Sequence, residues 1–356
     1  MSKLFMQVPI NFPAPSCHVG GAVLDLVYGK YRHVDIKILV RDEEKGKILA
    51  GKYPRVTSII GDLTSLDLLT REAGGADIVI NAGPEYKYDI AISAVLAGLA
   101  NHSPKAYYIH TSGAAKIWDS PDGSQTGSKM WDDVADIQEL NSSPSTAIHA
   151  TSDNLVSAAS TNTNVAILSP TIIYGLSPSP LHPTPLTLPI ALRSITKTNS
   201  GFTISSGTNI QGHIHVLDVA RIYLLLIDDA LQNPASSDPS KWGPVAYYFA
   251  TSEDLSSREY MTCLVSHLST HPSNLIRVTG IKELQFSEAI EVIGKSNATF
   301  FGVNMRARST RAKEVLGWSP REKRVGEVLG EVLDFYFRAK GETVGEEVLE
   351  TNFQKK

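Results

Sequence analysis

The chain has 356 residues, 42% hydrophobic and 20% charged, which is enough apolar material for one large or two smaller globular domains and excludes a disordered chain. Its formal net charge of −4, without a long run of Lys or Arg, argues against a nucleic acid as partner. The two cysteines, Cys17 and Cys263, exclude a disulfide framework and a CxxC metal site.

No segment of the sequence has the pattern of a leader or a membrane span. Pro9 and Pro13 interrupt the apolar stretch near the N-terminus, so it lacks the hydrophobic core of a signal peptide. The longest apolar run, 219–227, is about half the length of a membrane span and contains Arg221. We therefore expect a cytoplasmic protein that does not bind membranes.

The first half of the chain alternates strand-like and helix-like segments. The strand-like runs, rich in Ile, Val and Tyr, are 3–8, 35–40, 56–60, 77–83, 106–113 and 164–170. Helical patterns occupy 20–31 and 88–102 between them. Unbroken apolar strands that alternate with helices predict an α/β fold with a doubly wound parallel sheet, whose ligands lie at the carboxyl ends of the strands.

The second half of the chain is less regular. A proline-rich patch, 176–189, predicts either a surface loop or one edge of a substrate cleft. We predict a helix over 216–232 with Asp218 as its N-cap, a strand over 246–250, and helices near 256–269, 281–293 and 325–339. Residues 1–175, with 213–250 returning to them, should form a nucleotide-binding domain, and 176–356 mainly a smaller mixed substrate lobe.

Eight short motifs occur in an order that resembles a known family. They are VGGAVLDLV (19–27), LVRDEEK (39–45), GDLTS (61–65), DIVINAG (77–83), YIHTSG (108–113), SPTIIYG (169–175), HIHVLDVARIYLLL (213–226) and RAKEVLGWSP (311–320). Together they resemble the extended short-chain dehydrogenases/reductases, in the branch of NAD(P)-dependent epimerases and dehydratases. The resemblance implies a Rossmann-type sheet and a nicotinamide cofactor.

The glycine loop of that family is altered here. The family has GxxGxxG, whose glycines let the backbone approach the pyrophosphate at a helix N-terminus. Aligned on Gly20, this chain reads A-x-x-C-x-x-G, with Ala14 and Cys17 at the first two glycine positions and three prolines in the same loop. The resemblance assigns Cys17, Val19 and Gly20 to the cofactor site, and the altered loop predicts weak or absent nucleotide binding.

Other residues of the resemblance concern the far end of the cofactor. Arg41 directly follows a strand, where the family carries an acidic residue for NAD or a basic one for the 2′-phosphate of NADP, so we expect NADP. Asp62 and Leu63 correspond to the adenine contact, and Asn81, Ala82 and Gly83 to the turn beside the adenosine ribose. Pro170 is the last residue that the resemblance assigns to the cofactor site.

The expected catalytic residues depart from the family as well. Ser112 aligns with the hydroxyl that holds the substrate oxygen, and Tyr174 lies where the family lines its active site. The family's Tyr-x-x-x-Lys is replaced by His149 and Asp153. From spacing alone, these two share one helix face, where the carboxylate should raise the pKa of the imidazole and fit it for proton transfer. An inert surface pair remains the alternative.

We expect an oxidoreductase like the epimerases and dehydratases, acting on a small oxygenated metabolite, with Ser112 orienting it and His149 as acid or base. Ser112 and His149 should then lie within about 10 Å. The missing Tyr and Lys leave two alternatives: a non-catalytic NADP-binding regulator similar to the NmrA-like proteins, and a redox-neutral isomerase or cyclase that needs no nucleotide. The sequence predicts no metal site and does not indicate an oligomeric state.

Overall fold

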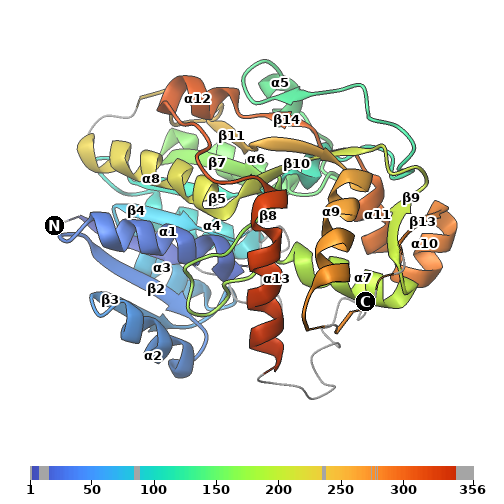
Figure 1. The fold of residues 1–356 in the computed structure, drawn as a ribbon. Coiled ribbons are helices and arrows are strands. Elements are labelled where there is room, and N and C mark those ends of the chain that lie inside the picture. Colours follow the sequence, from blue (N-terminus) through green and yellow to red (C-terminus); the bar gives the residue numbers. More distant parts are fainter. Residues whose placement is uncertain are drawn as a thin grey trace.

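A seven-stranded parallel sheet forms the centre of the computed structural model, which describes residues 2–7, 16–83, 89–234, 238–273, 275–276, 278 and 280–341. All neighbouring strands are parallel, as the unbroken apolar runs predict. In spatial order the strands are β11 (Tyr247–Ala250), β7 (Asn164–Pro170), β5 (Tyr107–Thr111), β4 (Ile78–Asn81), β1 (Lys3–Gln7), β2 (Asp35–Val40) and β3 (Val56–Ile60). The predicted α/β fold with a doubly wound parallel sheet is therefore confirmed (Figure 1).

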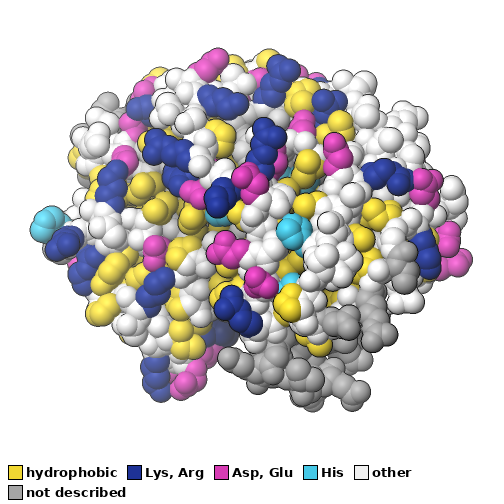
Figure 2. Space-filling model, viewed as in Figure 1, with side chains coloured by type: hydrophobic (Ala, Val, Ile, Leu, Met, Phe, Trp, Pro, Cys, Tyr) yellow, Lys and Arg dark blue, Asp and Glu magenta, His cyan; other side chains and the backbone are white. Residues whose placement is uncertain are grey.

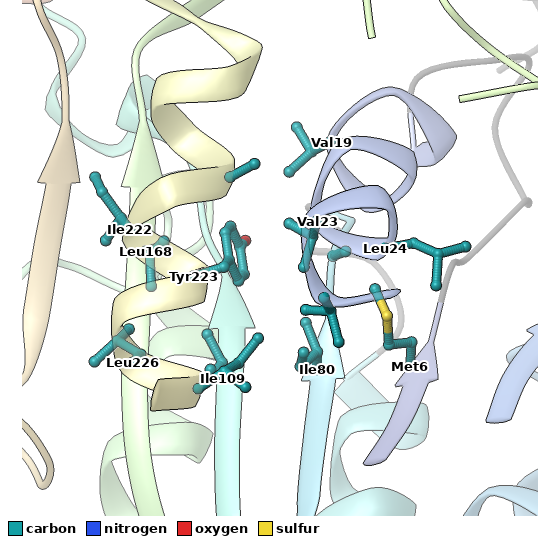
Figure 3. Close-up of a cluster of buried hydrophobic side chains, with 14 of the residues drawn as sticks. Met6, Val19, Val23, Leu24, Ile80, Ile109, Leu168, Ile222, Tyr223 and Leu226 are labelled. Carbon is teal, nitrogen blue, oxygen red and sulfur yellow. The ribbon is translucent and has the colours of Figure 1, made fainter. Parts of the chain in front are cut away.

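Helices cover both faces of this sheet (Figure 1). One face carries α1 (Ser16–Lys30), α2 (Glu43–Lys52) and α8 (Val216–Gln232). The other carries α3 (Leu66–Gly74), α4 (Asp89–Leu99) and α6 (Ala150–Ala158). Figure 3 shows the first layer, in which Val23 of α1 and Tyr223 of α8 pack over Ile80 and Ile109. Burial of these side chains supplies the main force that holds the helices on the sheet.

The later part of the chain adds three small sheets and further helices (Figure 1). The sheets pair β8 (Ile172–Tyr174) and β12 (Glu253–Ser256) with β10 (Ile210–His215), β13 (Ile281–Leu284) with β9 (Gly201–Ile204), and β14 (Ala307–Arg308) with β6 (Trp131–Asp132). The remaining helices are α5 (Ile137–Asn141), α7 (Thr187–Thr198), α9 (Ser257–Thr270), α10 (Phe286–Ile293), α11 (Lys295–Gly302), α12 (Thr310–Leu316) and α13 (Val325–Gly341), with short 3₁₀ turns at Ala114–Ile117 and Ala159–Thr161.

Two local predictions in this part are wrong. The helix expected over 281–293 is a strand, β13, followed by α10, because Ile281–Leu284 pair with β9 and tertiary pairing overrides the helical pattern. The N-cap of α8 is His215, whose ring Nδ1 accepts the Leu217 N–H. Asp218 lies within the first turn of α8 and instead accepts hydrogen bonds from the Arg221 guanidinium and from the Arg321 N–H.

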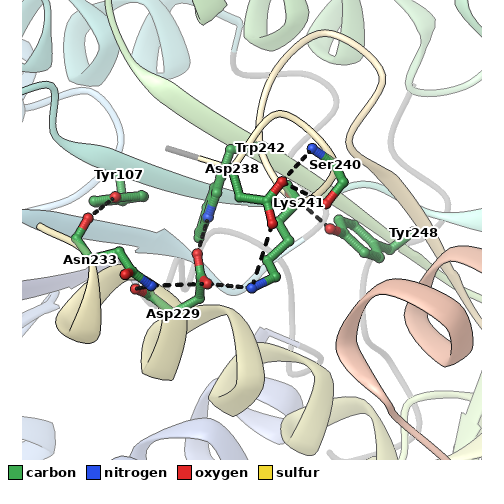
Figure 4. A network of polar contacts seen from close by, with 8 residues as sticks. All are labelled: Tyr107, Asp229, Asn233, Asp238, Ser240, Lys241, Trp242 and Tyr248. Atoms are coloured by element: carbon green, nitrogen blue, oxygen red, sulfur yellow. Dashed lines mark hydrogen bonds and ion pairs between the residues drawn. The ribbon is translucent and has the colours of Figure 1, made fainter. Parts of the chain in front are cut away.

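A polar network closes the edge of the sheet beside β11 (Figure 4). Asp229, near the end of α8, accepts hydrogen bonds from the Lys241 ammonium and from the Trp242 indole N–H, the latter at 2.8 Å. Tyr107 of β5 reaches the carbonyl of Asn233 at 2.7 Å. These contacts hold the connection between α8 and β11 against the sheet and keep β11 beside β7.

The face shown in Figure 2 carries Lys and Arg side chains interspersed with Asp and Glu. No stripe of a single sign crosses this face, as the composition predicts. Among the described residues, no helix is both long and apolar enough to cross a membrane.

Candidate functional site

Ser112 lies directly after β5, at the carboxyl edge of the sheet where ligands of such folds bind. Its N–H donates to the carbonyl of Leu168 at 2.7 Å, which extends the pairing of β5 with β7 by one residue. The side chain is fully buried, and its hydroxyl donates to Oδ2 of Asp153 at 3.1 Å. The hydroxyl therefore points at helix α6.

Asp153 is held by a lysine that the sequence pattern did not single out. The ammonium of Lys116, on the 3₁₀ turn Ala114–Ile117, lies 2.9 Å from Oδ2 of Asp153. The two side chains are 1% and 3% exposed, so this is a fully buried ion pair. Burial raises the pKa of Asp153, and the ammonium and the Ser112 hydroxyl oppose that rise. Only the position of Lys116, four residues after Ser112, could have suggested it.

His149 has an unusual backbone conformation. It is the N-cap of α6 with φ 70° and ψ −10°, a left-handed conformation that residues other than glycine rarely adopt. Its ring packs on the backbone of Gly113, where an added Cβ would lie only 2.7 Å from Nε2. Its carbonyl accepts the Asp153 N–H at 2.9 Å and the Ser152 hydroxyl at 2.9 Å. The start of the helix thus fixes the ring beside the residue that follows Ser112.

The predicted effect of Asp153 on His149 is wrong. Burial, and next the nearby ammonium of Lys116, lower the pKa of His149 from 6.5 to about 4, so the ring is neutral at neutral pH. The spacing argument fails because α6 begins at Ala150, so His149 precedes the helix whose face it was expected to share. Asp153 is turned instead toward Ser112 and Lys116.

The structure brings Ser112 and His149 together around Gly113, as the expected reaction requires. Tyr174 contacts a different part of the structure. Its ring lies 5.4 Å from that of His215, and its hydroxyl donates to the carbonyl of Lys323 at 3.0 Å, just before α13. The catalytic roles of Ser112, His149, Asp153 and Tyr174 stay predictions.

The start of the proline-rich patch packs on the nucleotide-side helices, and we name residues 175–182 the strap. The Nε2–H of His18, in the first turn of α1, donates to the Gly175 carbonyl at 2.9 Å, and the Ser177 hydroxyl donates to the His18 carbonyl at 2.6 Å. Ser179 lies so close to Gly21 that an added Cβ would be 2.2 Å from the Ser179 Cβ. Farther along, the Lys52 ammonium at the end of α2 binds the carbonyl of Pro178. The patch is thus a packed element of the fold up to 182, and its last residues open α7.

At the adenosine end of the expected cofactor site, Arg41 directly follows β2. Its Nε is buried and has no hydrogen-bond partner among the described residues. The neighbouring Asp42 caps α2 by accepting the Lys45 N–H at 2.9 Å and pairs with the Lys45 ammonium at 2.7 Å, which leaves the arginine without this acid. An unpaired guanidinium nitrogen fits a phosphate ligand at this position.

The other expected cofactor residues lie at the strand ends. Asp62 accepts the N–H of Thr64 at 2.8 Å in a local turn, and Asn81 accepts the Gly83 N–H at 3.3 Å. Leu63, Ala82, Gly83 and Pro170 are buried beside them, and Val19 and Gly20 are buried in α1. The backbone of Cys17 belongs to α1, whereas its side chain and the altered loop with Ala14 lie outside the described residues.

No family model matches this sequence, and no curated protein matches it either. The fold, by contrast, is similar to those of solved dehydratase and epimerase structures. It is similar to dTDP-glucose 4,6-dehydratase from Streptomyces venezuelae with NAD and TYD bound, with a TM-score of 0.63, 16% identity and coverage of 98% of this chain and 100% of the other. UDP-glucose 4-epimerase from Thermotoga maritima with UDP-glucose has a TM-score of 0.62 at 11% identity, covering 95% and 99% of the two chains.

Within the described part of the chain, no three His, Cys, Asp or Glu residues gather as a metal ion would require.

The buried histidines affect how the stability of the protein depends on pH. Burial lowers the pKa of His18, His149 and His213 to about 4 and that of His110 to about 3, from 6.5. They stay neutral in the folded protein at pH values where they are charged in the unfolded chain.

We therefore predict that stability is lost on mild acidification. Because the folded pKa values lie below the unfolded value of 6.5, the unfolded chain binds more protons at these histidines, so their contribution to stability is full above pH 6.5 and falls as the pH drops toward about 4. Asp133, whose pKa burial raises to about 7, acts in the opposite direction, as one group against four histidines. Each histidine costs about 1.4 kcal/mol per pH unit in that window. Urea unfolding at a series of pH values measures this. His213→Gln should flatten the dependence, whereas His33→Gln, at an exposed position, should not. Equal stability at pH 7 and pH 5 would contradict the prediction.

Proposed function

We propose that this protein is a nicotinamide-dependent oxidoreductase that acts on a small oxygenated metabolite, with proton transfer at His149. The observation that supports this most is the backbone of His149, a non-glycine residue at φ 70° that holds a neutral ring against Gly113 at the end of β5. Such conformations are costly, and they cluster at active sites. The carboxyl edge of the sheet is also where this fold binds its ligands.

The proposed roles follow from the protonation states. A neutral His149 acts as a base that accepts a proton from a substrate hydroxyl, and the charged ring returns it in the reverse direction. Ser112 lies beside it and orients the substrate oxygen. In this role the Ser112 hydroxyl turns away from Asp153, to which it donates a hydrogen bond in the structure. A bound nicotinamide would supply the hydride acceptor or donor for the carbon that bears this oxygen. Because the structurally similar enzymes act on nucleotide sugars, dTDP- and UDP-sugars are the first substrates to test.

The cofactor we propose is NADP, held at its 2′-phosphate by Arg41, whose buried Nε has no partner among the described residues. Asp62 and the turn from Asn81 to Gly83 flank the adenosine end. The prolines and the lost glycines of the loop before α1 predict that the affinity is weak.

Arg41→Ala should weaken binding of NADPH by about tenfold or more, because a charged hydrogen bond to phosphate is lost, and should leave NADH unaffected. Isothermal titration calorimetry with both nucleotides measures this. Arg32→Ala is the matched control, since Arg32 is exposed before the opposite end of β2. Equal affinity of wild type for NADH and NADPH, unchanged in Arg41→Ala, would rule out the preference for NADP.

One observation favours a second candidate, a non-catalytic NADP-binding regulator of the NmrA-like kind. The Ser112 hydroxyl is hydrogen-bonded to the Asp153 carboxylate, and the Lys116 ammonium binds the same carboxylate. These three side chains therefore bind one another instead of facing a substrate. Binding of NADPH without turnover of any oxygenated substrate in the panel would support the regulator. Turnover that changes the absorbance of the reduced nicotinamide would support the enzyme.

A further inference from the structure

The buried pair of Lys116 and Asp153 is the feature of this site that the proposed chemistry does not use. Three elements meet in it: the turn after β5 supplies Lys116, α6 supplies Asp153, and the end of β5 supplies Ser112. Both the ammonium and the Ser112 hydroxyl bond to the same carboxylate oxygen, Oδ2. The position of the ammonium therefore determines where the carboxylate and the serine hydroxyl lie.

The surroundings fix this ammonium still further. Its nitrogen lies 5.3 Å from the ring centre of Tyr247, on β11, which is a cation–π contact. Oδ1 of Asp153 has no hydrogen-bond partner among the described residues, and the buried hydroxyl of Tyr247 interacts with those of Ser169 and Ser112. A hydrophobic pair in place of two buried charges would often be at least as stable, so the ion pair calls for a reason other than stability.

The reason lies in the charges that face His149. Lys116 acts on it from the 3₁₀ turn and His110 from β5, whereas the Asp153 carboxylate is turned to Ser112 and Lys116. His110 is neutral, so of these two groups the Lys116 ammonium is the one that brings a positive charge to the His149 ring. It disfavours a second positive charge there and keeps His149 in the form that accepts a proton.

We propose that Lys116 is a positioning residue of the Ser112 and His149 site, which supplies from the turn after β5 the fixed positive charge that the resembled enzymes carry on the helix at the position of Asp153. This inference rests on the proposed function of that site. It places the positive charge on the turn after β5 instead of on the helix. The carboxylate of Asp153, which stands where the resembled enzymes have a lysine, then holds the Lys116 ammonium in place.

The test is the titration of His149, followed by NMR in the protein without ligands. A variant that removes both charges, Lys116→Met with Asp153→Asn, avoids leaving one buried charge unpaired. We expect the His149 pKa in this double variant to rise above about 4, while burial of the ring, the larger cause of the low value, still keeps it below 6.5. An exchange variant, Lys116→Asp with Asp153→Lys, keeps a cation in the site and should keep the low pKa. Lys37→Met is the control. Lys37 lies on β2, away from the site, and its ammonium pairs with the Glu72 carboxylate at 2.7 Å.

Each outcome decides the matter. A His149 pKa in the neutral double variant that equals the wild-type value would overturn the proposal, because the cation would then have no influence on the site. Failure of that variant to fold would overturn it as well, because the pair would be needed to build the fold. The titration needs no substrate or cofactor, so an absence of turnover would refute the proposed function and leave this result standing.

Discussion

His149→Ala is expected to lower turnover of any substrate this protein accepts by about 100-fold, the scale of a lost general acid or base. The ring is a neutral proton acceptor packed against Gly113, the residue that follows Ser112, and alanine offers no titratable group in its place. Steady-state kinetics measured over a range of pH values should show a large decrease in kcat and a smaller change in KM. Ser112→Ala should cost less, because water partly replaces one orienting hydroxyl.

Two controls separate chemistry from folding in this experiment. His149→Gly relieves the left-handed backbone at φ 70° and should be at least as stable as His149→Ala, yet equally inactive. His33→Ala changes an exposed histidine and should leave turnover unchanged. An activity of His149→Ala within threefold of wild type would show that the proton is transferred elsewhere.

Gly21→Ala is expected to destabilise the fold by about 1–3 kcal/mol, the usual cost of overpacking a tight contact. The new methyl group would lie 2.2 Å from Cβ and 2.8 Å from Cα of Ser179, and backbone atoms do not yield cheaply. This cost exceeds the gain of about 0.5–1 kcal/mol that alanine brings within a helix. Chemical denaturation followed by circular dichroism measures the difference.

The same helix offers a control for this substitution. Gly29, also in α1, has no atom within 4 Å of an added Cβ, so Gly29→Ala should be neutral or slightly stabilising. Combining Gly21→Ala with Ser179→Gly should cost less than the two single changes together, because the two shortest contacts, with Cβ and Oγ of Ser179, are then removed. Strict additivity, or a stable Gly21→Ala variant, would show that the strap does not press on α1.

The buried parallel strands were the most predictable part of the fold. The runs 35–40, 56–60 and 164–170 match β2, β3 and β7 residue for residue. Every residue of β7 is buried, as expected of a strand covered on both faces, whereas β3 at the edge of the sheet is only partly buried. Segment 281–293 was not predictable in this way, since its first residues fit a helical pattern until β9 is present to pair with them. A local sequence pattern fails to predict an element whose structure depends on pairing with a segment that is distant in the sequence.

The proximity of two candidate site residues was predictable from the sequence, and the detailed geometry around them was not. Ser112 and His149 do come together, since strand ends of a parallel sheet share one edge. The sequence did not show that α6 begins one residue after His149, which removes the expected pairing with Asp153. Nor did it show that Lys116 reaches Asp153 across the end of the sheet, because this contact depends on the turn that follows Ser112.

The close fit between Gly21 and Ser179 has a consequence for how this chain evolves. Positions 158 residues apart in the sequence (179 − 21) share one small volume, so a larger side chain at either requires the other to give way. Hydrogen bonds from the Ser177 hydroxyl to the His18 carbonyl and from the His18 ring to the Gly175 carbonyl hold the two segments together, so they cannot easily move apart to accommodate such a change. Selection therefore acts on helix and strap as a single unit, and substitutions accepted in one narrow the choices left to the other.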